Sequence, residues 1–138
     1  MNSRWIVRTK TQPSMRLFCF PYAGGGASVY RQWGQKLPLN IEVCPIYLPG
    51  RESRLNEPLY TDLDPLVEAL SEALRPHLDI PFAFFGHSLG ALLAYELARH
   101  LQAQQRPEPQ QLFASAHRAP QLSFTRTPIR HLPEAEFR

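Results

Sequence analysis

Residues 81–103, PFAFFGHSLGALLAYELARHLQA, are the stretch that decides the fold. Residues 82–85 are continuously apolar and predict a short buried strand, and residues 89–103 have the composition of a helix. Between the two lies GHSLG at 86–90, which matches the pattern G-x-S-x-G. The stretch therefore predicts a strand, a tight turn and a helix, with a serine at the turn.

The spacing of the two glycines has a mechanical reason. A turn this tight holds the serine in a strained backbone conformation, and side chains at positions 86 and 90 would collide. Gly86 and Gly90 remove that collision. Ser88 Oγ is then exposed at the carboxyl end of the sheet, and the N–H of Leu89 lies at a helix N-terminus, where developing negative charge is stabilised. We expect Ser88 to be a nucleophile; the alternative is a structural turn with incidental glycines.

The rest of the chain alternates short apolar runs with stretches of helical period. The expected strands are 17–20, 41–48, 82–85 and 112–115, with 5–8 as a candidate edge strand; the expected helices are 27–37, 64–78 and 89–103. Asp64 and Pro65 are expected as N-cap and first residue of the middle helix. Strands that are apolar throughout favour a mostly parallel sheet with helices on both faces, an α/β fold.

A glycine-rich loop, Pro21 to Gly26, follows the first strand. It leaves the sheet at the same edge as Ser88, and its glycines let the backbone approach a ligand closely. A backbone N–H from this loop, best assigned to Ala23, can complete an oxyanion hole with Leu89. A phosphate cradle is the rival interpretation, but neither G-K-[ST] nor G-x-G-x-x-G is present.

Length and composition limit the other classes of protein. The 138 residues make one domain, and 13 of the 15 basic residues are arginines scattered along the chain, which argues against a nucleic-acid surface. Cys19 and Cys44 lie in apolar runs, so we expect buried thiols rather than a disulfide or a metal site. No segment approaches the roughly 20 apolar residues of a membrane span. We expect a soluble, cytoplasmic monomer without membrane contacts.

Three motifs in order, 18–26, 48–54 and 84–91, resemble the type II thioesterases that accompany nonribosomal peptide and polyketide synthetases. The resemblance runs from Met15 to Arg138. It implies an α/β-hydrolase fold and hydrolysis of acyl or aminoacyl thioesters on the phosphopantetheine arm of an acyl or peptidyl carrier protein, the expected partner. It implies no cofactor or metal of the enzyme's own.

Carried over by residue, the resemblance makes Ser88 the nucleophile and the Ala23 and Leu89 amides the oxyanion donors. Gly86, His87 and Gly90 complete the nucleophile elbow, and His87 is not the base. Residues 120–138 resemble the start of the lid region of the family. Arg51 is expected to shape the turn at residues 49–50 rather than to touch substrate.

The remaining catalytic groups are not evident. The triad of this fold runs Ser, then Asp or Glu, then His, and only 50 residues follow Ser88. We expect residues 1–138 to be a single partial domain that lacks its C-terminal strands and is nearly inactive alone. His77 and His100 are expected on solvated helix faces, and His117 is not expected to serve as the base.

Two other functions use the same sequence features. Malonyl-type acyltransferases also carry G-H-S-L-G, although Glu usually follows it where this chain has Ala91. A non-catalytic module could keep the serine turn and only bind a carrier protein. Hydrolysis is favoured because the loop at 21–26 fits hydrolases better.

Overall fold

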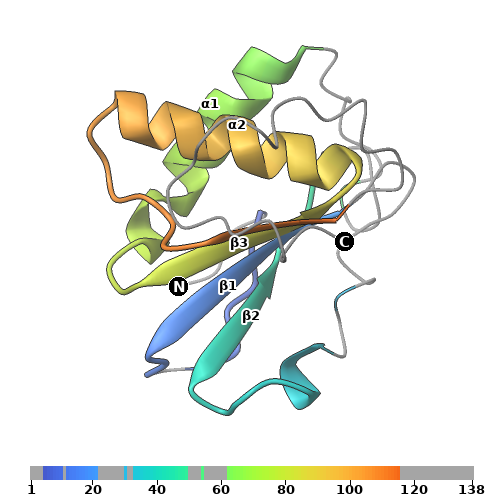
Figure 1. Cartoon of the computed structure of the whole chain (residues 1–138), viewed down its shortest axis with the longest axis vertical. Coiled ribbons are helices and arrows are strands. Elements are labelled where there is room, and N and C mark those ends of the chain that lie inside the picture. Colours follow the sequence, from blue (N-terminus) through green and yellow to red (C-terminus); the bar gives the residue numbers. More distant parts are fainter. Residues whose placement is uncertain are drawn as a thin grey trace.

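A four-stranded parallel sheet forms the centre of the protein in the computed structural model (Figure 1). The structure describes residues 5–10, 12–21, 30, 33–49, 54 and 62–115. Its elements, in chain order, are β1 (Met15–Phe20), η2 (Trp33–Gln35), β2 (Ile41–Pro45), α1 (Leu63–Leu74), η4 (Arg75–His77), β3 (Phe82–His87), α2 (Leu89–Ala103) and β4 (Leu112–Ser115).

The strand order is β2-β1-β3-β4, and each neighbouring pair is parallel. This confirms the α/β class and all four expected strands within a few residues. In the register of β1 with β3, Phe20 lies opposite Gly86. The carboxyl ends of these two strands therefore meet at one edge of the sheet, which is where the serine turn begins.

The two faces of the sheet carry different elements. Helices α1 and α2 lie together over one face (Figure 1), where alternate strand residues form the main core. Phenylalanine rings from β1 and β3 meet there edge to face, with centroids 5.1–6.1 Å apart. The opposite face carries a smaller cluster of Cys19, Tyr30 and Val43, against which Trp33 and Phe85 pack.

Strand β2 is shorter than the expected 41–48, because the chain changes partners after Pro45. Ile46 still donates its N–H to Cys19, but Tyr47 donates to Trp5, and Ile46 forms a single antiparallel bridge with Ile6. Residues 5–8 thus contribute one bridge residue, and the edge strand expected there is absent from the described segment 5–10.

The helices also differ from expectation at their ends. Helix α1 begins at Leu63 with Asp62 as the N-cap, and Asp64 lies in its first turn instead of capping it. It ends at Leu74 and gives way to the 3₁₀ helix η4, where Pro76 cannot donate an N–H to continue the α-helical ladder. A helix is expected at 27–37, and within its described residues the structure has the short 3₁₀ helix η2. The Lys36 N–H donates to the Trp33 carbonyl at the end of η2.

A buried carboxylate, that of Glu42, holds the N-terminal segment against β2. It accepts backbone N–H bonds from Thr9 and Lys10 at 2.6 and 2.9 Å, and bonds from the Nε atoms of Arg8 and Arg16 at 3.1 and 3.2 Å. Desolvation alone would raise the pKa of Glu42, but these donors lower it below its ordinary value. The charge is therefore kept and fully hydrogen-bonded inside the protein.

Arg16 extends this cluster to the turn after α1. Its Nη1 donates to the His77 carbonyl at 2.8 Å and to the Asp79 carboxylate at 2.5 Å. The expected solvated position of His77 is wrong: its side chain is 97% buried, and its Nδ1 has no hydrogen-bond partner within the described part of the chain. Desolvation, with the positive charges of Arg8 and Arg16 nearby, lowers the pKa of His77 and keeps the ring neutral.

Both cysteines are buried free thiols, as expected. In the segments that the structure describes, no helix is both long and apolar enough to cross a bilayer.

We predict that Glu42→Gln lowers the free energy of unfolding at pH 7 by about 3 kcal/mol, because it leaves two arginines without their buried counter-charge. Since the folded pKa of Glu42 lies below the unfolded value near 4.5, this stabilisation is present above that pH and is lost as the pH falls through the folded pKa. Urea unfolding followed by far-UV circular dichroism at pH 7 and pH 3 measures both effects.

Glu72→Gln is the matched control, because Glu72 pairs with Arg75 and Arg106 while remaining 63% exposed. We expect it to change the unfolding free energy by less than about 1 kcal/mol. Equal destabilisation by Glu42→Gln at both pH values would contradict the assigned role.

Candidate active site

Ser88 lies in the single-residue turn between β3 and α2. Its backbone has φ 57° and ψ −118°, in the region of positive φ that residues other than glycine rarely adopt. A conformation of this kind costs on the order of 1–3 kcal/mol and persists only where the surroundings impose it. The side chain is exposed. The strained serine turn predicted from G-x-S-x-G is therefore present.

The two glycines of the motif allow close backbone packing at this turn. A Cβ at Gly86 would overlap the Gly90 carbonyl and lie 2.6 Å from the Ala91 nitrogen. A Cβ at Gly90 would overlap the Phe20 carbonyl oxygen and lie 2.8 Å from that of Pro21. Gly86 thus relieves a collision inside the turn, as expected. Gly90 relieves a collision with the end of β1, a contact that the sequence pattern does not reveal.

Leu89 is the first residue of α2, and its side chain is 38% exposed beside Ser88. The Ser88 carbonyl already accepts the N–H groups of Ala91 and Leu92, at 2.9 and 3.2 Å, so the helix starts at the turn itself. The first N–H groups of a helix have no acceptor within that helix and favour negative charge. Ala23, the other expected oxyanion donor, lies outside the described residues, as do Arg51, His117 and residues 120–138.

Two residues that the sequence analysis did not single out hold the carboxyl ends of neighbouring strands. The Tyr30 hydroxyl donates to the Phe20 carbonyl at 2.6 Å, at the end of β1. Arg54 is 96% buried, donates to the Tyr47 carbonyl just after β2 at 2.9 Å, and stacks 4.2 Å above the Trp5 ring. The position of Arg54 within the 48–54 motif was the one sequence signal that could have identified it.

Neither of the two cysteines, nor His77 or His100, competes with Ser88 at this edge. Burial raises the pKa of Cys44 to about 12 and that of Cys19 well above its ordinary value, so neither is a thiolate near neutral pH. His100 lies 11 residues after Leu89, about 16 Å along α2. His77 is bound near the opposite end of β1 through Arg16. His87 is the half-buried last residue of β3, directly before the serine.

The described residues offer no group of three or more His, Cys, Asp or Glu side chains able to hold a metal ion.

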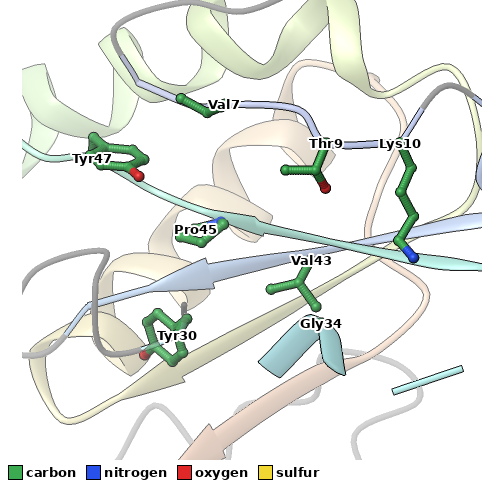
Figure 2. Close-up of a pocket in the computed structure, with 8 residues that line it drawn as sticks. All are labelled: Val7, Thr9, Lys10, Tyr30, Gly34, Val43, Pro45 and Tyr47. Atoms are coloured by element: carbon green, nitrogen blue, oxygen red, sulfur yellow. The ribbon is translucent and has the colours of Figure 1, made fainter. Parts of the chain in front are cut away.

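A small cavity of about 170 Å³ lies beside β2, between the N-terminal segment and the residues Tyr30 and Gly34 (Figure 2). Val7, Thr9 and Lys10 of the N-terminal segment line it together with Tyr30, Gly34, Val43, Pro45 and Tyr47. It contains no residue of the 86–90 turn and is smaller than the roughly 300–1,000 Å³ of typical ligand pockets. This cavity is therefore not the candidate active site.

Comparisons with known proteins identify the family of this chain. The family described as "Thioesterase domain" matches residues 15–137. The chain is 52% identical over 137 residues to Linear gramicidin dehydrogenase LgrE from Brevibacillus parabrevis, covering 98% of this chain and 52% of the relative. It is 43% identical over 137 residues to the Gramicidin S biosynthesis protein GrsT from Aneurinibacillus migulanus, covering 98% and 54%.

Among solved structures, the type II thioesterase BorB from the borrelidin biosynthetic cluster superposes with a TM-score of 0.76 at 33% identity. The match covers 83% of this chain and 47% of that one. The chain thus spans about half the length of the curated relatives it matches. The fold of the matched half is the α/β-hydrolase fold of these thioesterases, as the sequence predicts.

We predict that Gly90→Ala destabilises the protein by about 3 kcal/mol or more, because its Cβ would overlap a backbone carbonyl that cannot rotate away. Thermal unfolding measures the effect. Gly34→Ala is the matched control: a Cβ there meets nothing within 4 Å, and we expect a change below about 0.5 kcal/mol. Equal unfolding temperatures for the two variants would show that the turn is looser than described.

Proposed function

This chain belongs to the thioesterase domain family, and from that premise we propose that the full-length protein hydrolyses acyl or aminoacyl thioesters on the phosphopantetheine arm of a carrier protein. Such a reaction would clear mis-primed or stalled modules of a nonribosomal peptide or polyketide synthetase. Support for this setting comes from the relatives, since GrsT is named for gramicidin S biosynthesis and BorB for the borrelidin cluster. The proposed partner is an acyl or peptidyl carrier protein, and the protein is proposed to act as a cytoplasmic monomer.

The observation that carries the proposal is the strained, exposed Ser88 at the N-terminus of α2. In the proposed reaction Ser88 Oγ attacks the thioester carbonyl carbon and loses its proton to a general base. The negative charge that forms on the carbonyl oxygen is stabilised by the Leu89 N–H, and by Ala23 as the second proposed donor. The tetrahedral intermediate then collapses, the C–S bond breaks, and the pantetheine thiol leaves with a proton.

The second half of the reaction releases the acid. Water attacks the ester formed on Ser88, the general base takes its proton, and the carboxylic acid leaves as Ser88 recovers its hydroxyl proton. His77 and His100 are too far from Ser88 to supply this base, so we assign it to residues outside the described segments. No cofactor takes part in the proposed reaction.

Three other functions are weaker candidates. An acyltransferase would use the same Ser88 ester but pass the acyl group to an acceptor other than water. A dehydrogenase, as LgrE is named, would need a dinucleotide site, and the chain has no G-x-G-x-x-G fingerprint. A binding module would leave Ser88 unreactive.

Incubating the full-length protein with an acyl-loaded carrier protein tests the proposal, with free acid and free carrier thiol quantified by mass spectrometry. With the unmodified protein, we expect one free acid for each carrier thiol released. We expect Ser88→Ala to reduce the rate of release on the order of 10⁴-fold or more, since the nucleophile is lost. Ser14→Ala is the control, because Ser14 is exposed before β1, at the opposite end of the sheet.

The outcomes separate the candidates. Transfer of the acyl group to added pantetheine without acid release would contradict hydrolysis and support an acyltransferase. A Ser88 that fails to react with a fluorophosphonate probe in the full-length protein would contradict both and leave the binding module.

A further inference from the structure

A side chain binds the end of β1 in addition to the strand ladder, in which Phe20 still pairs with Gly86. Phe20 is the last residue of β1, and Pro21 follows it. Proline has no N–H, so the peptide after Phe20 cannot donate a hydrogen bond to a neighbouring strand. The Tyr30 hydroxyl supplies a hydrogen bond at this point, donating to the Phe20 carbonyl at 2.6 Å while its own side chain is 97% buried.

The Phe20 carbonyl lies directly against the first turn of α2. A Cβ on Gly90 would overlap its oxygen, and the Pro21 oxygen is 2.8 Å from the same position. Gly90 comes immediately after Leu89, whose N–H is the proposed oxyanion donor. A shift of the Phe20 carbonyl would therefore disturb the first turn of α2, which carries the Leu89 N–H.

Aromatic contacts hold Tyr30 in place. The centroid of its ring lies 5.0 Å from that of Trp33 and 5.8 Å from that of Phe85, and both ring pairs are nearly perpendicular. The ring centroids of Trp33 and Phe85 are 4.7 Å apart. Phe85 belongs to β3, three residues before Ser88. Figure 2 shows the hydroxyl of Tyr30 directed away from Val43 and Gly34. The ring is thus anchored on the strand that carries the nucleophile, while its hydroxyl binds the neighbouring strand.

From this arrangement we infer that Tyr30 is a positioning residue that holds the end of β1 against the first turn of α2 and so positions the Leu89 N–H, the proposed oxyanion donor. The inference rests on the proposed function, because it deepens the role of the same site. Tyr30 does not touch the substrate; it acts through the Phe20 carbonyl. Its hydrogen bond matters most when the carbonyl oxygen of the substrate becomes negatively charged, so it should affect the transition state more than the binding of substrate.

Tyr30→Phe in the full-length protein removes the hydroxyl and keeps the ring contacts. With an acyl-N-acetylcysteamine thioester as substrate, we expect kcat to fall roughly 10-fold with KM within about twofold, less than the 10²- to 10³-fold loss typical of a direct oxyanion donor. The inhibition constant of a trifluoromethyl ketone analogue, whose serine-bound form carries the tetrahedral oxyanion, should rise by the same factor as kcat falls. The pH profile should keep its shape, because the general base is untouched.

Tyr47→Phe is the matched control, since Tyr47, just after β2, lines the same cavity as Tyr30 (Figure 2). Its backbone binds Arg54 and Trp5, so removing its hydroxyl leaves those hydrogen bonds in place. We expect it to leave kcat, KM and the inhibition constant unchanged. Titration of active sites with a fluorophosphonate distinguishes positioning from partial unfolding: in Tyr30→Phe all sites should still react, more slowly.

The inference is overturned if Tyr30→Phe keeps kcat and the inhibition constant within twofold of the unmodified protein. It is also overturned if kcat of Tyr30→Phe falls by the same factor as the fraction of its active sites that react with the fluorophosphonate, because the loss would then be unfolding. If the unmodified protein does not hydrolyse thioesters at all, the proposed function fails instead. The ketone affinities and labelling rates of the two proteins then still decide whether Tyr30 positions the site.

Discussion

The structure depends on the close approach of three backbone segments at the carboxyl end of the sheet. Gly86, Gly90 and the Phe20 carbonyl lie so near one another that no side chain fits between them. This approach fixes Ser88 at positive φ and places the start of α2 against the end of β1. Because backbone carbonyls cannot rotate away as side chains do, the position of Ser88 is set by the packing of the whole sheet, and strain at one residue is maintained by the core.

Opposite ends of the same sheet are held by different physical means. At the amino end, the buried Glu42 carboxylate binds backbone N–H groups and two arginines, and so fastens the N-terminal segment to the strands. At the carboxyl end there is backbone contact, with Tyr30 and Arg54 each donating to a carbonyl where a strand finishes. The buried negative charge of Glu42 thereby lies away from the edge where the proposed chemistry would generate a new negative charge.

Features encoded in consecutive residues could be predicted from the sequence. The apolar runs predicted three strands of a parallel sheet to within two residues at each end, and the glycine spacing predicted the strained turn at Ser88. What escaped prediction depends on partners distant in the sequence. His77 follows an amphipathic helix and looks solvated, but its side chain is buried in η4, and its carbonyl accepts a hydrogen bond from Arg16, 61 residues earlier. Tyr30 and Arg54 likewise bind carbonyls that no local pattern identifies, and β2 ended early because the N-terminal segment competes for its last residues.

The central claim is that the geometry at 86–90 makes Ser88 the residue that accepts the acyl group. Rapid mixing of the full-length protein with an acyl-loaded carrier protein, acid quenching and peptide mass spectrometry test it directly. The account predicts a transient mass increase equal to the acyl group, confined to the peptide that contains Ser88 and decaying as free acid appears. Acid release with the acyl group on any other residue, or with no acyl adduct under conditions that trap a serine ester, would contradict it.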